Sequence, residues 1–264
     1  MLKIGILREG KVPPDSRVPL SPQQCRQVLD TFPVSLVVQP SPIRSFTDAE
    51  YAAFHIPLQE DLRECDVLMG VKEVPVSQLI PGKTYMFFSH TIKKQPYNRP
   101  LLQALLANRI RMIDYETLTD PTGNRLIAFG FYAGMVGAHN GIWTYGKRTG
   151  LFHLSRLYQC HEYADAKKEY DKIDWPPLRV ALTGSGRVAS GAIRNLQDMG
   201  FQAVTPQDFL TKTWDVPVYT QLFARDYVRH LDPAAGTFDK THFYQHGEEY
   251  VSVFSPYYRC ADIM

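Results

Sequence analysis

Several features are scarce or missing in this chain of 264 residues, and each absence excludes a class of protein. The formal net charge is only +2, and lysines and arginines are mixed among acids, which argues against a nucleic-acid partner. No apolar run approaches the roughly 18 residues that span a bilayer, and the first residues predict a strand followed by charge, not a signal peptide. We therefore expect a soluble, cytoplasmic protein with no membrane partner.

Cysteine is also scarce. The four cysteines, Cys25, Cys65, Cys160 and Cys260, are far apart, form no C-x-x-C pair and have no histidine at zinc-ligand spacing. We interpret them as reduced structural thiols and predict no metal site. The length is sufficient for two domains of ordinary size, each with its own core.

The most informative stretch that is present runs from Val180 to Ala192, V-A-L-T-G-S-G-R-V-A-S-G-A. An apolar run turns through glycines into a helix, as in strands that deliver a dinucleotide pyrophosphate to a helix N-terminus. Gly184 permits the tight turn, Gly186 lets backbone amides approach phosphate oxygens, and Ala189 is small enough for the helix to pack on its strand. A purely structural glycine turn is the alternative. The predicted cofactor-binding residues are Gly184, Gly186, Arg187, Val188 and Ala189.

The residues after this turn extend the pattern. Residues 187–199 predict a helix, Gly200 is a fitting C-cap, and residues 201–204 predict a second strand. Asp208 follows Gly186 by roughly the twenty residues expected of an acid that binds the cofactor ribose. Pro206 places Asp208 in the loop after the strand, so its ribose role is less secure than the phosphate role of the glycines.

The same acid sets the expected cofactor. A carboxylate at Asp208 repels a 2′-phosphate, so NAD is preferred over NADP. Arg187 in the turn and Lys212 beyond the acid are positive, and they keep NADP as the less favoured alternative.

Strands alternate with helices along the first half of the chain, which predicts a parallel sheet with helices on both faces. We expect an α/β fold of two Rossmann-like doubly wound domains with a cleft between them. The boundary falls near Ala128, giving a substrate domain over 1–128 and a dinucleotide-binding domain over 129–264. The expected strands are 3–7, 34–38, 67–71, 84–88 and 110–114, and the expected helices are 22–30, 48–54 and 98–108.

A long segment rich in glycine and aromatic residues, 129–149, predicts a bridging helix with small residues placed for close packing. Its glycines resemble a phosphate loop, but no compact strand precedes them, so helix packing is the favoured interpretation. The Trp175-Pro176-Pro177 run ends any helix just before the dinucleotide strand.

Three residues of the first half follow predicted strands directly: Lys72 after 67–71, His90 after 84–88 and Glu116 after 110–114. Ligands of open α/β sheets bind at the carboxyl ends of the strands. A desolvated lysine can act as a base, and histidine exchanges protons near pH 7. The alternatives are a surface lysine paired with Glu73 and a packing or surface histidine. Arg17, in the loop after the first strand, is either a solvated residue or the partner of a substrate carboxylate.

These residues lie in segments that resemble a known family. R-V-P-L-S-P, V-K-E-V-P, F-F-S-H-T-I-K-K-Q-P-Y-N, D-Y-E and A-F-G-F-Y-A-G resemble the alanine dehydrogenase and transhydrogenase superfamily. Within it, the third and last motifs resemble lysine-forming saccharopine dehydrogenases and the lysine-ketoglutarate reductase domain of the bifunctional lysine-degrading enzyme. The resemblance covers most of residues 1–210 and is more specific in the first domain than in the second.

The resemblance implies roles for individual residues. Lys72 would be the base that accepts the amine proton, and His90 the acid–base group that handles water and the carbinolamine. Glu116 would tune these two proton carriers. Substrate-binding residues would be Arg17, which holds a carboxylate, Gln95 and Phe129, which line the site, and Arg125, which stands where family members often carry an arginine.

Family members also run well beyond 264 residues, and residues 261–264 predict the beginning of a strand that is cut off, so we expect an incomplete second domain. The expected function is an NAD-dependent amino-acid oxidoreductase that converts saccharopine, NAD and water to lysine, 2-oxoglutarate and NADH, or the reverse. Alanine dehydrogenase, and a non-catalytic truncated nucleotide-binding paralogue, are the alternatives. Oligomeric state cannot be read from the chain.

Overall fold

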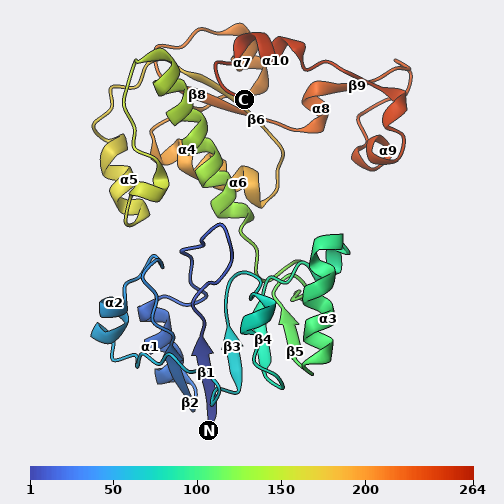
Figure 1. The fold of residues 1–264 in the computed structure, drawn as a ribbon. Coiled ribbons are helices and arrows are strands. Elements are labelled where there is room, and N and C mark those ends of the chain that lie inside the picture. The colour runs from blue at the N-terminus through green and yellow to red at the C-terminus, as the bar shows by residue number, and fades with distance from the viewer. The chain divides into compact units, whose positions relative to one another are not determined.

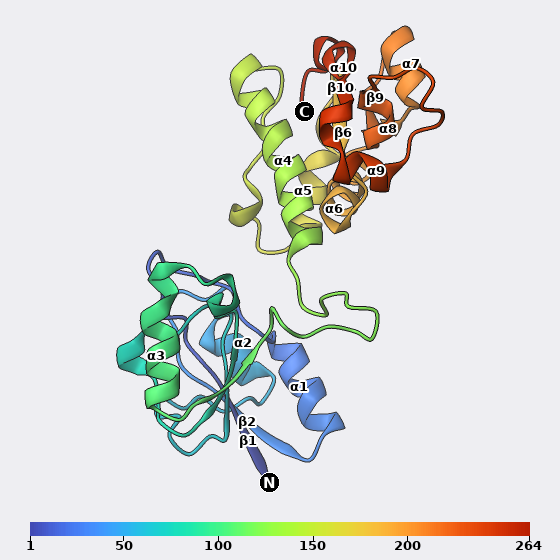
Figure 2. The same ribbon diagram turned by 90° about the vertical axis from the view of Figure 1, so that its right-hand side faces the viewer.

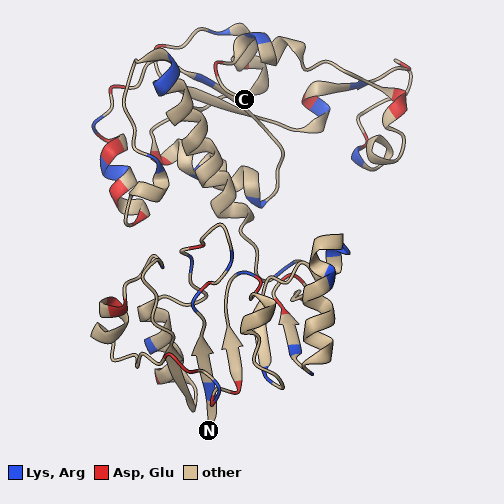
Figure 3. Ribbon diagram, viewed as in Figure 1, with Lys and Arg blue, Asp and Glu red and all other residues tan.

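A computed structural model describes all of residues 1–264, which divide into two units, Met1–Ala128 and Phe129–Met264 (Figure 1). Each unit combines helices with a parallel sheet, so the predicted α/β class is confirmed. Basic and acidic residues are interspersed in both units (Figure 3). None of the helices combines the length and the apolar character needed to cross a membrane.

The first unit is built on a 5-stranded sheet in which all neighbours are parallel, in the order β2-β1-β3-β4-β5. The chain starts in the middle, at β1, adds β2 on one side and then builds β3, β4 and β5 on the other. In such doubly wound sheets, ligands bind outside the carboxyl ends of the strands where the direction of winding reverses, which here is between β1 and β3. The strands are β1 (Leu2–Ile6), β2 (Val34–Val38), β3 (Val67–Met69), β4 (Thr84–Phe87) and β5 (Arg111–Asp114).

Helices cover both faces of this sheet, as predicted. Successive strand residues point to opposite faces, and in β2 Leu36 joins one buried cluster while Val37 joins the other. The cluster of Leu36 includes Cys25 and Tyr51, and that of Val37 includes residues of the helix on the other side. The helices are α1 (Pro22–Thr31) and α2 (Asp48–Ala53) on one face and α3 (Arg99–Ala107) on the other. In Figure 2, α1 and α3 lie on opposite sides of this sheet.

The helix starts follow local sequence signals. Ser21 caps α1 with its hydroxyl oxygen, which accepts the N–H of Gln24, and Pro22 occupies the first turn as expected. Thr47 caps α2 in the same manner, through the N–H of Glu50.

The second unit contains a 3-stranded parallel sheet in the order β6-β8-β7. Ile263, near the end of the chain, forms a parallel bridge with Val180 on the other side of β6, as expected of an extended segment. The elements are α4 (Gly130–Thr149), α5 (Tyr163–Tyr170), β6 (Arg179–Thr183), α6 (Arg187–Asp198), β7 (Gln202–Ala203), α7 (Pro206–Thr211), β8 (Val218–Leu222) and α10 (Ser255–Cys260).

Helices α4 and α6 touch at glycines. A Cβ atom on Gly134 would lie 1.8 Å from the carbonyl oxygen of Val188, and one on Gly191 would lie 1.8 Å from that of Phe131. The two backbones therefore approach more closely than any side chain allows. This confirms the prediction that the small residues of 129–149 serve helix packing.

A small appendage between β8 and α10 has no counterpart among the predicted elements. It consists of α8 (Ala224–Tyr227) and an antiparallel pair of strands, β9 (Val228–His230) and β10 (Tyr250–Ser252), joined through α9 (Lys240–Gln245). Figure 1 shows β9 and α9 extending away from the β6–β8 sheet.

Candidate active site

Three predicted site residues of the first unit follow three adjacent strands. Lys72 comes after β3, His90 after β4 and Glu116 after β5. Because these strands are parallel neighbours, their carboxyl ends lie along one edge of the sheet. The sequence therefore brings a lysine, a histidine and a glutamate to the edge at which sheets of this kind bind ligands.

Lys72 is held by a carboxylate that the sequence analysis did not single out. Glu9, in the loop after β1, accepts the backbone N–H of Lys72 at 2.9 Å and that of Val71 at 2.6 Å. Burial raises the pKa of Glu9 above its usual value, although the two backbone hydrogen bonds oppose the shift. Glu9 thus links the loop after β1 to the loop after β3, at the point where the winding of the sheet reverses.

The expected alternative for Lys72, pairing with Glu73, does not occur. Glu73 pairs instead with Lys11. Burial opposes ionisation of Glu73, but the hydrogen bond from Lys11, a backbone hydrogen bond and the charge of Lys11 together hold the pKa of that carboxyl below its usual value. The partly buried Lys72 side chain is left without a carboxylate at ion-pair distance, while the Asp15 carboxylate lies near enough for Lys72 to contribute to lowering its pKa.

His90 and Glu116 form a pair. The Nδ1 atom of His90 lies 3.0 Å from Glu116 Oε2, and the other carboxylate oxygen of Glu116 lies 3.1 Å from Lys93 Nζ. Burial works against ionisation of Glu116, yet the hydrogen bonds from His90 and Lys93 hold its pKa below the usual value. Lys93 Nζ also lies 3.1 Å from His90 Nδ1. When Lys93 donates to Glu116 instead, the ionised Glu116 accepts a proton from Nδ1 and leaves Nε2 as a proton acceptor.

Arg125 adds a second cation beside Lys93, because its guanidinium lies 3.4 Å from Glu116 Oε1. The arginine before the A-F-G-F segment is thereby brought to the predicted proton carriers. Half-exposed, it retains contact with solvent.

A buried carboxylate positions the His90–Glu116 pair. Asp114, at the end of β5, accepts the backbone N–H of Glu116 at 2.8 Å and the hydroxyl of Ser89. His90 itself has a left-handed backbone, with φ of 56°, a conformation that is uncommon for a residue with a side chain. The side-chain amide of Asn98 donates to the carbonyl of His90 at 3.1 Å and holds this turn.

Arg17 forms a two-point pair with Asp15, in which Arg17 Nε lies 2.9 Å from Asp15 Oδ1 and a terminal nitrogen contacts Oδ2. The hydrogen bond from Arg17 lowers the pKa of Asp15. A guanidinium carries five N–H donors, and this pair uses two of them. A substrate carboxylate at Arg17 would therefore share the guanidinium with Asp15.

The two remaining predicted substrate residues are Gln95 and Phe129. Gln95 is exposed in the loop after His90 and lines a hollow with Thr91, Lys94 and Asn98 that does not include His90. Phe129 is the first residue of the second unit, precedes α4 and is 42% exposed. The substrate-binding role of both residues stays a prediction.

In the second unit, the glycine turn connects β6 to α6. Gly184 has φ of 96°, which favours glycine, and Gly186 is the N-cap of α6 without any side chain to satisfy the first N–H groups. A Cβ atom on either glycine would meet nothing within 4 Å, so the space beside the helix N-terminus is open. Ala189 is buried, whereas Val188 is 55% exposed. These residues fit a dinucleotide pyrophosphate.

The sheet order changes the surroundings of this turn. The strand beside β6 is β8, not β7, so Asp208 lies one strand further from the glycines than its spacing indicated. Asp208 occupies the first turn of α7 and pairs with Lys212 at 2.9 Å. Its ribose role stays a prediction. The residues that follow β8 include the exposed Arg225 and the partly buried Asp226, and Gln221 donates to the carbonyl of Gly184 at 2.7 Å.

Comparison with known proteins places the strand-end group in a family context. Residues 5–136, half of the chain, match the family model described as the alanine dehydrogenase/PNT N-terminal domain. The chain belongs to this family. The matched range contains the strand-end residues Lys72, His90 and Glu116.

Within the family, curated relatives resemble most of the chain. It is 32% identical to the mitochondrial alpha-aminoadipic semialdehyde synthase of Rattus norvegicus over 93% of this chain and 29% of the relative. It is 27% identical to the NAD(+), L-lysine-forming saccharopine dehydrogenase of Yarrowia lipolytica, over 80% of this chain and 60% of the relative. The chain thus spans less than a third of the synthase and well over half of the dehydrogenase. The resemblance to saccharopine dehydrogenases inside the alanine dehydrogenase superfamily is confirmed.

Solved structures agree on the fold. A transhydrogenase from Sinorhizobium meliloti superposes with a TM-score of 0.55 at 14% identity, covering 77% of this chain and 58% of that protein. An L-alanine dehydrogenase superposes with a TM-score of 0.52 at 15% identity, covering 83% of this chain and 60% of that protein.

Sequence reasoning missed Glu9, Asp114 and Lys93 as parts of the group. Glu9 could have been found by the rule that selected Lys72, because it follows β1, the strand next to β3. Lys93 carried no signal beyond its distance of three residues from His90.

Proposed function

We propose that the protein containing this chain is a nicotinamide-dependent oxidoreductase that acts on the C–N bond of an amino acid. The proposed reaction is saccharopine, NAD and water to lysine, 2-oxoglutarate and NADH, or its reverse. The observation that carries the proposal is the alignment of Lys72 with the His90–Glu116 pair at one edge of the sheet. Similarity to alpha-aminoadipic semialdehyde synthases and saccharopine dehydrogenases supports the choice of substrate.

The first proton transfer is assigned to Lys72. Hydride leaves a carbon readily only when the attached amine has lost its proton, because the nitrogen lone pair must form the new C=N bond. Lys72 Nζ, with no carboxylate at ion-pair distance, accepts the proton from the secondary amine of saccharopine. The Glu9 carboxylate holds the Lys72 backbone in place during this step.

Hydrolysis is assigned to His90. With Nδ1 bonded to Glu116, the free Nε2 accepts a proton from water as the oxygen attacks the C=N carbon, and then returns it to the departing lysine nitrogen. Addition of water gives a carbinolamine. As its C–N bond breaks, the hydroxyl proton passes through His90 Nε2 to the departing nitrogen, the C=O bond forms, and lysine and 2-oxoglutarate are released. Arg17 and Arg125 would bind carboxylates of the substrate, each in competition with the acid that it already contacts.

The nucleotide is assigned to the turn between β6 and α6. Gly184, Gly186 and the first N–H groups of α6 would hold the pyrophosphate. When bound, a nicotinamide dinucleotide supplies the hydride acceptor. NAD is the proposed form because the chain is similar to a NAD(+) saccharopine dehydrogenase. Arg225 follows β8, the strand beside β6, and is the residue that would favour NADP.

The direct test mixes the natural protein that contains this chain with NADH, lysine and 2-oxoglutarate and follows NADH absorbance. Oxidation that requires both substrates is the expected result. Oxidation with pyruvate and ammonia instead would assign the protein as an alanine dehydrogenase. Binding of NADH with turnover of neither pair would make it a non-catalytic nucleotide-binding protein. A parallel titration with NADP distinguishes the cofactors, and tighter NADP binding would contradict the NAD assignment.

A further inference from the structure

The appendage between β8 and α10 lacks a core of its own. Of residues 228–252, none is classed as buried, and its centre is a two-stranded ribbon. An isolated two-stranded ribbon is marginally stable, and small units without a core usually depend on a disulfide or a metal. The appendage contains no cysteine, so a disulfide within it is excluded.

Imidazole and carboxylate groups meet inside this appendage. His230 of β9, His242 of α9 and Glu249 offer one ligand atom each, and these atoms all lie within 4.8 Å of one another. Glu249 Oε2 lies 3.2 Å from His230 Nε2 and 3.8 Å from His242 Nε2. Zinc bonds of about 2.0–2.2 Å in a tetrahedron separate neighbouring ligand atoms by about 3.3 Å, which is close to both distances.

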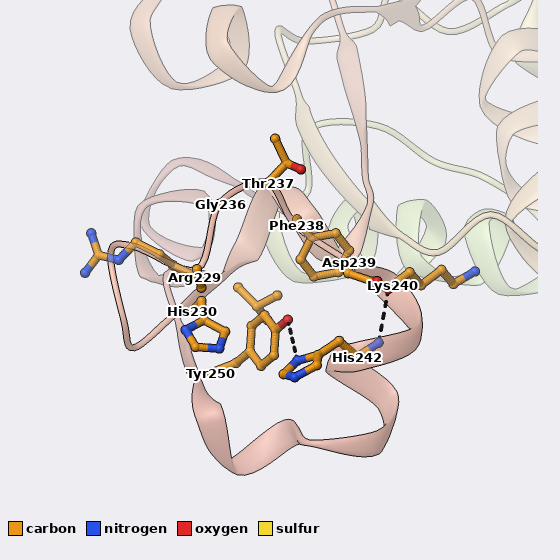
Figure 4. Close-up of a pocket in the computed structure, with 11 residues that line it drawn as sticks. Arg229, His230, Gly236, Thr237, Phe238, Asp239, Lys240, His242 and Tyr250 are labelled. Carbon is orange, nitrogen blue, oxygen red and sulfur yellow. Dashed lines mark hydrogen bonds between the residues drawn. The ribbon is translucent and has the colours of Figure 1, made fainter.

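The outer nitrogens of the two histidines have different partners. Tyr250 OH lies 3.2 Å from His242 Nδ1 (Figure 4). A proton on Nδ1 leaves the lone pair on Nε2, the nitrogen that lies 3.8 Å from Glu249 Oε2. His230 Nδ1 accepts the backbone N–H of Asp232 at 2.9 Å, so without metal the ring proton lies on Nε2, toward Glu249. Metal binding at Nε2 displaces this proton to Nδ1, where the carbonyl oxygen of Asp232, 3.2 Å away, accepts it. Metal-bound histidines commonly donate their second N–H to a carbonyl or another oxygen, and this fixes the ring.

We propose that the appendage binds one divalent transition-metal ion, zinc in the first instance, through His230 Nε2, His242 Nε2 and Glu249. Two neutral imidazoles and one carboxylate are a set that zinc accepts, and a water molecule completes the tetrahedron. The ion joins β9, α9 and the start of β10, and so replaces the missing core. The adjoining cavity, of about 830 Å³, is lined by His230, His242 and Tyr250 and gives the ion a route from solvent.

His246 and Glu248 are neighbours outside the ligand set. His246 Nδ1 lies 3.7 Å from Glu248 and 4.0 Å from Oε1 of Glu249, the oxygen that faces away from the two ligating histidines. The side chain of Glu248 is more exposed than that of any ligand, and the side chain of His246 is about as exposed as that of Glu249. Glu248 therefore offers a matched control, since it is the same residue type one position earlier in the chain.

The test titrates zinc into metal-free protein without a polyhistidine tag, in competition with a chromophoric chelator, with Cys160 and Cys260 replaced by serine. We expect one zinc ion per chain, binding at least tenfold weaker in Glu249→Gln and unchanged in Glu248→Gln. Tyr250→Phe, which keeps every ligand, should weaken binding about tenfold or more through His242. No zinc bound, or equal effects of the two glutamate substitutions, would overturn the proposal.

Limited proteolysis supplies a readout that does not depend on variants. Zinc should slow cleavage within residues 231–240 of the unsubstituted protein, and a chelator should restore it. Cleavage at the same rate with and without zinc would contradict the stabilising role. Both measurements are independent of oxidoreductase activity.

Discussion

The carboxylate of Glu9 accepts the backbone N–H of Lys72 at 2.9 Å and links the loops that follow β1 and β3. These two strands are adjacent, and the winding of the sheet reverses between them. A partly buried acid at this point is therefore both a structural tie and the support of the proposed base.

Replacing Glu9 by glutamine tests the tie. The carboxylate offers one oxygen to each of two backbone N–H groups, whereas the amide of glutamine offers one oxygen and places its NH₂ against the second donor. We expect Glu9→Gln to lower the free energy of unfolding by about 1–3 kcal/mol in urea denaturation. Glu60→Gln, in an exposed pair with Arg8, should cost less than about 1 kcal/mol. Equal losses of unfolding free energy in the two variants would show that the hydrogen bonds of Glu9 to Val71 and Lys72 do not stabilise the fold.

The pH dependence of stability tests Glu116. Its pKa is lowered by hydrogen bonds from His90 and Lys93 against the effect of burial, so the ionised form is favoured by folding. That stabilisation is present above the ordinary value of 4.5 and is lost as the pH falls through the lower folded value. Glu116→Gln should therefore cost about 1–2 kcal/mol near neutral pH, after allowance for the half-exposed partners Lys93 and Arg125, and progressively less in acid. A cost that does not change with pH would contradict the pairing.

Two glycines of one helix test the α4–α6 contact. Gly134→Ala puts a methyl group where the carbonyl of Val188 lies, so we expect a loss of about 1–3 kcal/mol or more in the free energy of unfolding. Gly137→Ala meets no atom within 4 Å and should be stabilising by about 0.5–1 kcal/mol, because alanine favours helix. Thermal denaturation of the two variants gives opposite shifts if the contact is as described.

The nucleotide turn can be tested by a substitution that separates binding from stability. Aspartate is a favoured N-cap residue, and a side chain at Gly186 meets nothing within 4 Å, so Gly186→Asp should maintain or raise thermal stability. Its charge and bulk occupy the space assigned to pyrophosphate, and NADH binding should weaken at least tenfold in a fluorescence titration. Unchanged affinity would remove the turn from the cofactor site.

Much of the fold is predictable from the sequence because the signals are local. The strand at 34–38, the caps at Ser21 and the glycine turn at Gly184 each depend on a few neighbouring residues, and the structure has each of them. The strand-end rule placed Lys72, His90 and Glu116 on adjacent strands because a doubly wound sheet aligns its carboxyl ends.

What could not be predicted depends on strand order and on distant contacts. No local pattern states that β8 lies between β6 and β7, and that order separates Asp208 from the glycine turn. Glu9 reaches Lys72 across 63 positions of sequence, and His230 meets Glu249 only because β9 pairs with β10. The spacings around cysteine predict no metal site, and no local pattern brings His230, His242 and Glu249 together, because they meet only through the pairing of β9 with β10.

The central claim, that Lys72 is the proton acceptor of an amino-acid oxidoreductase, is tested most directly by the rate of NADH oxidation with lysine and 2-oxoglutarate in Lys72→Met. Lys83→Met is the matched control, since Lys83 precedes β4 at the opposite edge of the sheet. We expect the control to match the unsubstituted protein and Lys72→Met to lose about 10²–10⁴-fold in kcat, the usual contribution of a general acid–base group. Turnover of Lys72→Met at the unsubstituted rate would contradict the account.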